Sequence, residues 1–277
     1  MIDLIAQHVA HLRATGKAAR TIEEREKVLR RLDADLPCGV NEATVEELEN
    51  WLGNDLFGRQ CKATYFGHIV GYYRWASSPD RPVSLEWDPS AGLVRPRVPE
   101  GEPRPISTEQ LTQARANLTQ PWRLYVELAA FAGLRCIEIA RLDRVDVTKE
   151  TLTVRRGKGD KRRVVPTAGD LWRAIQPLPP GPVARTLRGT RWAERQLSSR
   201  TAEHLDRIGL EDVTLHRCRS WYATYLLDEG AEITSVQRAM GHASLKTTAV
   251  YLQFTSKQRA RLLKATDALP ALAPVPC

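Results

Sequence analysis

Residues 216–253 read HRCRSWYATYLLDEGAEITSVQRAMGHASLKTTAVYLQ and hold two histidines, three arginines and three tyrosines among apolar positions with helical spacing. His216 and Arg219 are three residues apart, so on a helix they share one face. Two interpretations fit this stretch. It is either a buried basic helical hairpin with a few core aromatics, or a site in which a tyrosine attacks a group that the cationic side chains hold.

The composition favours a polyanionic partner. The chain has 277 residues, with 41 lysines and arginines against 33 aspartates and glutamates, and a formal net charge of +8. Many soluble proteins are equally basic without binding nucleic acid, so the charge alone is weak support. The amino terminus does not resemble a signal peptide and no apolar run is long enough to span a membrane. We therefore expect a cytoplasmic protein with no membrane partner.

The cysteines indicate neither a disulfide framework nor a zinc site. They are odd in number and widely scattered, without CxxC or Cys/His ligand spacing. We predict free thiols at Cys38, Cys61, Cys136, Cys218 and Cys277.

Residues 1–80 indicate a helical domain. T-I-E-E at Thr21 and T-V-E-E at Thr44 both fit the capping box, which predicts that helices begin there. A helix over 63–77 is rich in aromatic residues. An aromatic core face is the favoured interpretation, but a DNA-facing surface can lie on the opposite side of the same helix.

The next segment, 81–104, is dense in proline and arginine and is predicted to be an interdomain linker. A second domain is expected over 105–265, and S-T-E-Q at Ser107 predicts another capped helix in it. Residues 151–167, TLTVRRGKGDKRRVVPT, have two β-rich runs joined by a glycine-containing turn, which is typical of a hairpin. Residues 266–277 are expected to form a frayed tail.

Each polar residue of the second domain has an ordinary structural explanation when taken alone. Arg135 and Glu138 are three residues apart and fit an intrahelical ion pair. Lys158 lies in the turn G-K-G-D, where lysine is common, and His216 and Arg219 simply share one helix face. The order and spacing of the elements change this interpretation.

Five elements occur in a fixed order: G-L-R-x-x-E from Gly133, G-K-G-D-K-R-R-V-V-P from Gly157, H-x-x-R from His216, G-H from Gly241, and Tyr251 nine residues past His242. Over about residues 105–260 the chain thereby resembles the tyrosine recombinase (phage integrase) family. The resemblance implies a mainly α fold with a small β-sheet, in which a helical-bundle core-binding domain precedes a mixed α/β catalytic domain. It also implies a small two-domain integrase, with no room for an amino-terminal arm-binding domain.

Carried over by position, Arg135 and Arg219 are expected to clamp the DNA phosphate under attack, and His242 to donate a further hydrogen bond to it. The chemistry is consistent, because attack on phosphorus builds negative charge on the non-bridging oxygens. Arginine is suited to this task, since its planar fork matches two oxygens and stays charged at any working pH. Glu138 is expected to help orient the site.

The family pattern implies that Tyr251 is the nucleophile. Tyr222 and Tyr225 are rival tyrosines by composition and are assigned to packing. His216 is expected to act as general acid/base near Tyr251. Lys158 is expected to protonate the leaving 5′-hydroxyl, because an ammonium on a flexible turn reaches over the phosphate and neighbouring cations lower its pKa.

Several further cations are candidates for contact with backbone phosphates or are simply solvated. Six of the ten residues in VRRGKGDKRR are basic and one is acidic. The candidates in the linker and in this stretch are Arg95, Arg97, Arg155, Arg156, Lys161, Arg162 and Arg163.

The resemblance implies a site-specific recombinase that forms a covalent 3′-phosphotyrosine and needs no metal, ATP or other cofactor. Integration or excision of a phage or other mobile element is the expected role. The expected partners are double-stranded DNA core sites, three further copies of the chain in a tetramer that passes through a Holliday junction, and an accessory directionality factor. Without DNA we expect a monomer or weakly associated protein.

Other functions compatible with the motifs are chromosome or plasmid dimer resolution, type IB topoisomerase activity, and DNA-binding regulation without chemistry. The compact size favours a recombinase over the topoisomerase, and the intact set of motif residues argues against a pure binder.

The second motif departs slightly from the family, with Cys218 and Trp221 where leucine and other residues are frequent. If Cys218 is exposed, thiol reagents are expected to inhibit the enzyme.

Overall fold

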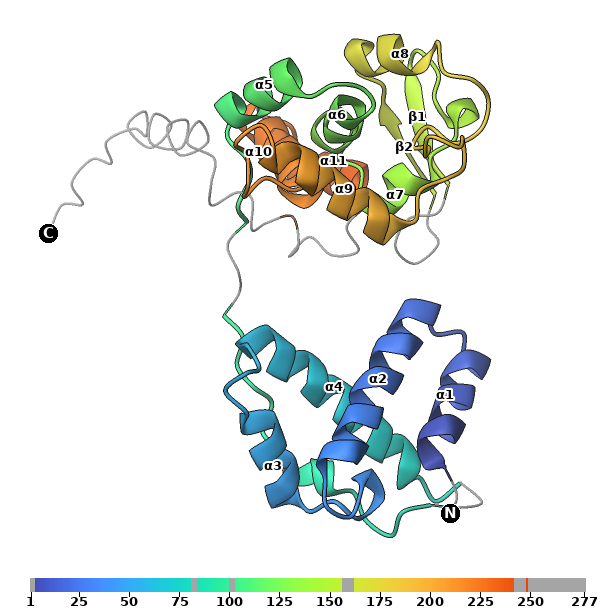
Figure 1. Ribbon diagram of the computed structural model, residues 1–277, viewed down its shortest axis with the longest axis vertical. Coiled ribbons are helices and arrows are strands. Elements are labelled where there is room, and N and C mark those ends of the chain that lie inside the picture. Colours follow the sequence, from blue (N-terminus) through green and yellow to red (C-terminus); the bar gives the residue numbers. More distant parts are fainter. Residues whose placement is uncertain (1–2, 81–83, 100–102, 156–161, 242–247, 249–277) are drawn as a thin grey trace, which may run out of the picture. The chain divides into compact units, whose positions relative to one another are not determined.

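The computed structural model describes residues 3–80, 84–99, 103–155, 162–241 and 248. These form mostly helices with one short sheet (Figure 1), which confirms the expected fold class. In this part of the chain no helix is both long and apolar enough to cross a membrane. The chain folds into two compact units, Met1–Gly101 and Glu102–Cys277.

The first unit packs its helices around an aromatic and aliphatic core. Tyr72 and Tyr73 are fully buried, and their hydroxyls donate to Asn41 Oδ1 and the Val40 carbonyl, both at 2.6 Å. These bonds satisfy the only polar atom of each side chain, so both rings can enter the core without an unpaired hydroxyl. The elements are α1 (Leu4–Ala14), α2 (Ala19–Asp35), η1 (Val40–Glu42), α3 (Val45–Gly53), α4 (Arg59–Ala76) and η2 (Pro89–Gly92).

Helix α4 shows that the aromatic stretch faces the core. Tyr72, Tyr73 and Trp75 are buried, whereas Gly67 and Arg74 are exposed on the other side of the helix. The core interpretation of these aromatic residues is therefore confirmed, and the helix still presents a polar outer face.

The predicted helix starts are partly confirmed. Thr44 with Glu47 and Ser107 with Gln110 form complete capping boxes. The prediction at Thr21 is wrong, because α2 has already begun at Ala19 and Thr21 lies inside its first turn. Ala18, the residue before the helix, supplies no side-chain cap, so Thr21 and Glu24 do not form a capping box at the start of α2.

The second unit is organised around α6. This helix is apolar on nearly all sides and packs against α5, α7, α8, α9 and α10 (Figure 1). Its surroundings explain why it lacks an exposed polar face. The elements are α5 (Thr108–Asn117), α6 (Trp122–Ala132), α7 (Cys136–Arg141), η3 (Arg144–Asp146), β1 (Thr151–Val154), β2 (Arg163–Pro166), α8 (Gly169–Ile175), α9 (Glu194–Asp206), α10 (Leu215–Asp228) and α11 (Ile233–Met240).

The predicted hairpin has antiparallel strands at its base. β1 and β2 pair with Thr151 opposite Pro166 and Val154 opposite Arg163. Along β2 Val164 is exposed and Val165 is buried, so the alternation of the strand places Arg163 on the same inward side as Val165. This register brings a basic residue into the interior of the unit.

Candidate active site

The carboxylate of Glu138 lies at the centre of the site. Its side chain is 0% exposed, and it belongs to the first turn of α7. The Arg135 backbone N–H donates to Glu138 Oε2 at 2.8 Å, and Arg135 Nη1 donates to Oε1 at 3.0 Å. The same side chain therefore caps the start of the helix and pairs with the arginine that precedes it.

Two more arginines reach this carboxylate from distant parts of the sequence. Arg163 of β2 donates from Nη1 to Oε1 and from Nη2 to Oε2, both at 2.7 Å, in a bidentate pair. Arg219 of α10 places Nη1 at 3.6 Å from Oε2. Burial alone raises the pKa of Glu138, but the hydrogen bonds and charge of Arg163 and the charge of Arg219 outweigh it and hold the pKa below its usual value.

The backbone carbonyls at the end of α11 accept hydrogen bonds from the same three arginines. Arg163 Nε donates to the Ala239 carbonyl at 2.8 Å, Arg219 Nη2 to the Met240 carbonyl, and Arg135 Nη2 to the Gly241 carbonyl at 3.1 Å. The last carbonyls of a helix lack partners within the helix and carry its partial negative charge. The arginines satisfy them and fix the end of α11 against α7, β2 and α10.

Gly133 is required where α6 ends. Its backbone is left-handed, with φ +61°, and a Cβ there would lie 2.6 Å from Tyr222 Cδ1 of α10. Its carbonyl accepts a hydrogen bond from Arg219 Nη1. A tight turn without a side chain thus lets α6 and α10 approach closely enough for Arg219 to cross between them.

The cluster keeps an excess of positive charge. Three arginines and one carboxylate leave a formal charge of +2 among Arg135, Arg163, Arg219 and Glu138. Arg135 is the most accessible of the three, since its side chain is 24% exposed against 9% for Arg163 and 2% for Arg219. Such a set of fixed cations can hold an anion such as a phosphate diester.

His216 lies exposed in the first turn of α10, one turn before Arg219. Partial desolvation of the imidazole and the positive charges of Arg219 and Arg135 lower its pKa from the ordinary value. The neutral ring is therefore favoured near pH 7, which is the form that accepts a proton.

The structure brings together Arg135, Glu138 and Arg219, which the sequence singled out, and places His216 on the same helix as Arg219. Helix α11 ends immediately before Gly241 and His242. The remaining predicted site residues lie outside the described residues; they are Lys158, His242, Tyr251, Arg156 and Lys161.

Arg163 differs from the expectation that it contacts backbone phosphates or is simply solvated. Its side chain is only 9% exposed and each of its three nitrogens donates within the protein. A guanidinium so enclosed serves the interior of the site. The sequence held no signal for this, because Val164 and Val165 are both apolar and only the structure shows that Val165, on the strand face of Arg163, is the buried one.

The other described candidates for DNA contact remain at the surface. Arg95, Arg97 and Arg162 are exposed. Arg155 is 58% exposed and pairs with the buried Asp146. Exposure is compatible with their predicted role and with plain solvation.

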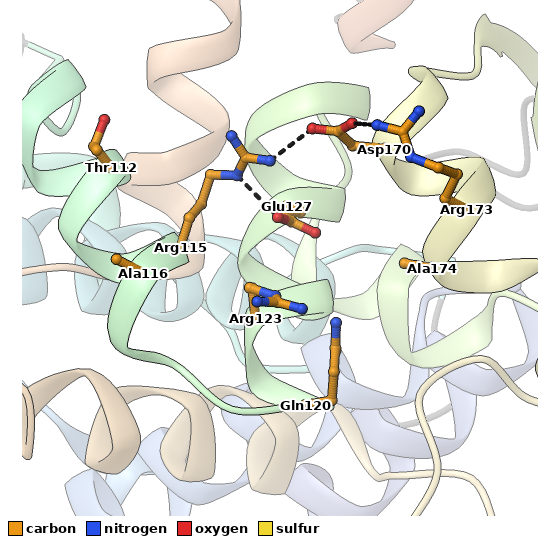
Figure 2. A pocket seen from close by; sticks show the side chains of 9 residues that line it. All are labelled: Thr112, Arg115, Ala116, Gln120, Arg123, Glu127, Asp170, Arg173 and Ala174. Carbon is orange, nitrogen blue, oxygen red and sulfur yellow. Dashed lines mark hydrogen bonds and ion pairs between the residues drawn. The ribbon is translucent and has the colours of Figure 1, made fainter.

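A separate cavity of about 630 Å³ lies among α5, α6 and α8 (Figure 2). Arg115 spans its wall, pairing with Glu127 at 2.9 Å and Asp170 at 2.6 Å, and Arg173 also pairs with Asp170. None of the motif residues lines it, and its charges are largely paired. Within the described residues no group of three or more histidines, cysteines and acidic residues is arranged to hold a metal ion.

Residues 105–258 match the model of the phage integrase family. The tyrosine recombinase XerC of Corynebacterium efficiens is 28% identical over 90% of this chain and 85% of its own length. The tyrosine recombinase XerA of Thermococcus kodakarensis is 30% identical over 64% of this chain and 70% of its own.

Solved structures share the fold. A lambda integrase dimer bound to a COC′ core site aligns with TM-score 0.74 and 17% identity, over 92% of this chain and 77% of that chain. A lambda integrase tetramer bound to a Holliday junction aligns with the same TM-score and identity, over 90% and 76%.

The contact between Gly133 and Tyr222 predicts an unusual sensitivity to a single methyl group. Gly133→Ala should lower the free energy of unfolding by about 3 kcal/mol, because it adds overpacking to backbone strain. Gly209→Ala is the matched control, since Gly209 also has positive φ, +77°, but nothing within 4 Å of an added Cβ. It should cost only about 1–2 kcal/mol. Urea unfolding measures both, and equal losses would contradict the role of the Tyr222 contact.

Cys218 is fully buried, so it lacks the exposure that inhibition by thiol reagents would require. Burial also raises the pKa of its thiol to about 12, which leaves almost no reactive thiolate. Treatment of the native protein with iodoacetamide at pH 8 should label the exposed Cys38 and spare Cys218, as read by peptide mass spectrometry. Denatured protein serves as the control, and equal labelling of both cysteines before denaturation would contradict the burial.

Proposed function

Because the chain belongs to the phage integrase family of tyrosine recombinases, enzymes that cleave and rejoin DNA strands, we propose that it is a site-specific recombinase acting through a covalent 3′-phosphotyrosine. The arginine cluster around Glu138 is the observation that carries this proposal. Its net positive charge is held in place before any ligand arrives, as catalysis of phosphoryl transfer requires. We retain the division into a core-binding domain over 1–80, a linker over 81–104, a catalytic domain over 105–265 and a tail over 266–277 as part of the proposal.

Arg135 and Arg219 bind the non-bridging oxygens of the scissile phosphate. The two Nη atoms of Arg219 each donate one hydrogen to the Gly133 and Met240 carbonyls and offer their second hydrogen to the phosphate. As the phosphorus becomes five-coordinate, charge grows on these oxygens and the attraction to both guanidiniums strengthens. Preorganised donors of this kind typically contribute about 3 kcal/mol each to the stability of the transition state. His242 donates a further hydrogen bond to the same phosphate.

Tyr251 attacks phosphorus and its phenolic oxygen forms the new P–O bond, while the bond to the 5′-oxygen breaks. His216 accepts the phenol proton, which its lowered pKa supports, and Lys158 protonates the leaving 5′-oxygen. Rejoining reverses these transfers at the same or another 5′-hydroxyl. The linkage conserves the energy of the broken ester, so no nucleotide cofactor is consumed.

The rival tyrosines are poorly placed for attack. Tyr222 is buried against Gly133, and burial raises the pKa of its phenol, which disfavours the phenolate. Tyr225 is 46% exposed but its ring stacks on Trp221, with centroids 4.8 Å apart. Both arrangements support a packing role and leave the nucleophile to Tyr251.

Integration or excision of a mobile element, by a tetramer on DNA core sites with an accessory directionality factor, is the biological role we favour. The fold shared with lambda integrase supports it. Resolution of chromosome or plasmid dimers is the second candidate, which the relatives named XerC and XerA favour. Plasmids that carry paired sites separate the roles: a dimer-resolving enzyme recombines two copies of one site, whereas an integrase joins two different sites.

The target DNA can be obtained from the reaction itself. A library of nicked duplexes with a randomised core is incubated with the protein, and complexes that survive denaturation are recovered and sequenced. A nick beside the cleaved bond lets the short strand diffuse away, so the covalent product accumulates. The most enriched sequence, here called the selected duplex, serves in the experiments below.

Tyr251→Phe should abolish the covalent adduct on the selected duplex, because the variant lacks the attacking oxygen. Tyr225→Phe, the matched control, should form adduct in normal yield. Denaturing gel electrophoresis of the labelled strand measures both. An adduct of wild-type yield in Tyr251→Phe would refute the assignment of the nucleophile.

The rate of cleavage should fall as the pH is lowered below neutral. The pKa of His216 is lowered from about 6.5, so the ring is neutral at pH 7 and becomes protonated only below that value. Single-turnover cleavage should therefore slow as the pH falls through the lowered pKa. His216→Asn should cleave about 10²-fold more slowly at pH 7 and lose this acidic limb. An unchanged acidic limb in the variant would assign it to another group.

A further inference from the structure

The guanidinium of Arg163 joins segments that flank different catalytic residues of the proposed reaction. Arg163 is the first residue of β2 and lies five residues after Lys158 in the sequence. Its two Nη atoms pair with both oxygens of Glu138, the residue that holds Arg135. Its Nε donates to the Ala239 carbonyl near the end of α11, shortly before His242.

Contact with Gly241 makes this arrangement tight. A Cβ at Gly241 would lie 3.0 Å from Arg163 Nη1, 3.2 Å from its Cδ and 3.3 Å from its Cζ. The side chain of Arg163 therefore lies against the glycine backbone, and the Gly241 carbonyl accepts from Arg135. Displacement of the Arg163 side chain therefore shifts α11 relative to Arg135. It also shifts Gly241, which immediately precedes His242.

We infer that Arg163 is a positioning residue for strand cleavage, which holds α7, β2 and the carbonyl end of α11 in register through its bonds to Glu138 and Ala239. The inference rests on the proposed function, because it concerns the rate of that reaction. Arg163 acts through the residues that it holds, because its three nitrogens donate to both oxygens of Glu138 and to the Ala239 carbonyl.

The shape of arginine is required in addition to its charge. Two parallel bonds to Glu138 and a third, differently directed bond to Ala239 need a planar fork. The ammonium of lysine can neutralise Glu138 but cannot span both partners. Loss of the fork should displace the phosphate-binding arginines by a fraction of an ångström, which slows the chemical step more than it weakens DNA binding.

The test compares Arg163→Gln and Arg163→Lys with wild type and with Arg200→Gln. Arg200 is a matched control, because it also pairs with a glutamate, Glu203 at 2.8 Å, but on the exposed face of α9. Single-turnover cleavage of the selected duplex is measured at saturating enzyme, well below each variant's melting midpoint. Affinity for the same duplex is measured separately by fluorescence anisotropy.

Arg163→Gln is expected to cleave about 10²-fold more slowly and Arg163→Lys at least about tenfold more slowly, with both dissociation constants within about twofold of wild type. Arg200→Gln should match wild type in both measurements. A wild-type cleavage rate in Arg163→Lys would overturn the inference, even if Arg163→Gln does not fold. A loss confined to DNA affinity would also overturn it, by assigning Arg163 to the DNA interface.

These outcomes are distinct from failure of the proposed function. If wild-type protein forms no adduct with any member of the library, the recombinase proposal fails first. If wild type forms the adduct and the Arg163 variants form it at the same rate, the proposal stands and only the positioning role is refuted.

Discussion

The charge of a buried carboxylate must be neutralised, and the second unit is built around the arginines that neutralise Glu138. Leaving such a charge unpaired in the interior costs several kcal/mol. Arg135, Arg163 and Arg219 come from three elements that are far apart in the sequence, and each approaches the same side chain. The electrostatic requirement of one residue therefore specifies how α7, β2 and α10 meet.

The same three arginines also satisfy the carbonyl end of α11, so one set of side chains performs two structural tasks. Buried ion pairs are weak evidence for stability, because desolvation of the charges offsets much of their attraction. Their value here lies in geometry. Cations fixed by a carboxylate and by helix carbonyls need no reorganisation when a phosphate binds, and this is the condition for stabilising charge in a transition state.

The sequence and the structure agree where the signal is local. Thr44 and Ser107 each precede a carboxylate or amide three residues on, and both start helices as predicted. The same pattern at Thr21 does not mark a helix start, because α2 begins two residues earlier, at Ala19. A helix whose apolar side is buried does not need a side-chain cap. Arg163 differs from its expectation for another reason: in a stretch with six basic residues among ten, composition cannot show which side chain turns inward.

The sequence by itself determined the family, the mainly helical fold and the identity of the motif residues, because these depend on residue type, order and local periodicity. Only the tertiary structure decided which partners each arginine has. Arg135 remains partly exposed, whereas Arg163 is enclosed between Glu138 and the end of α11. Burial and hydrogen-bond partners arise from contacts between distant segments, and a linear pattern carries no record of which donors those contacts will consume.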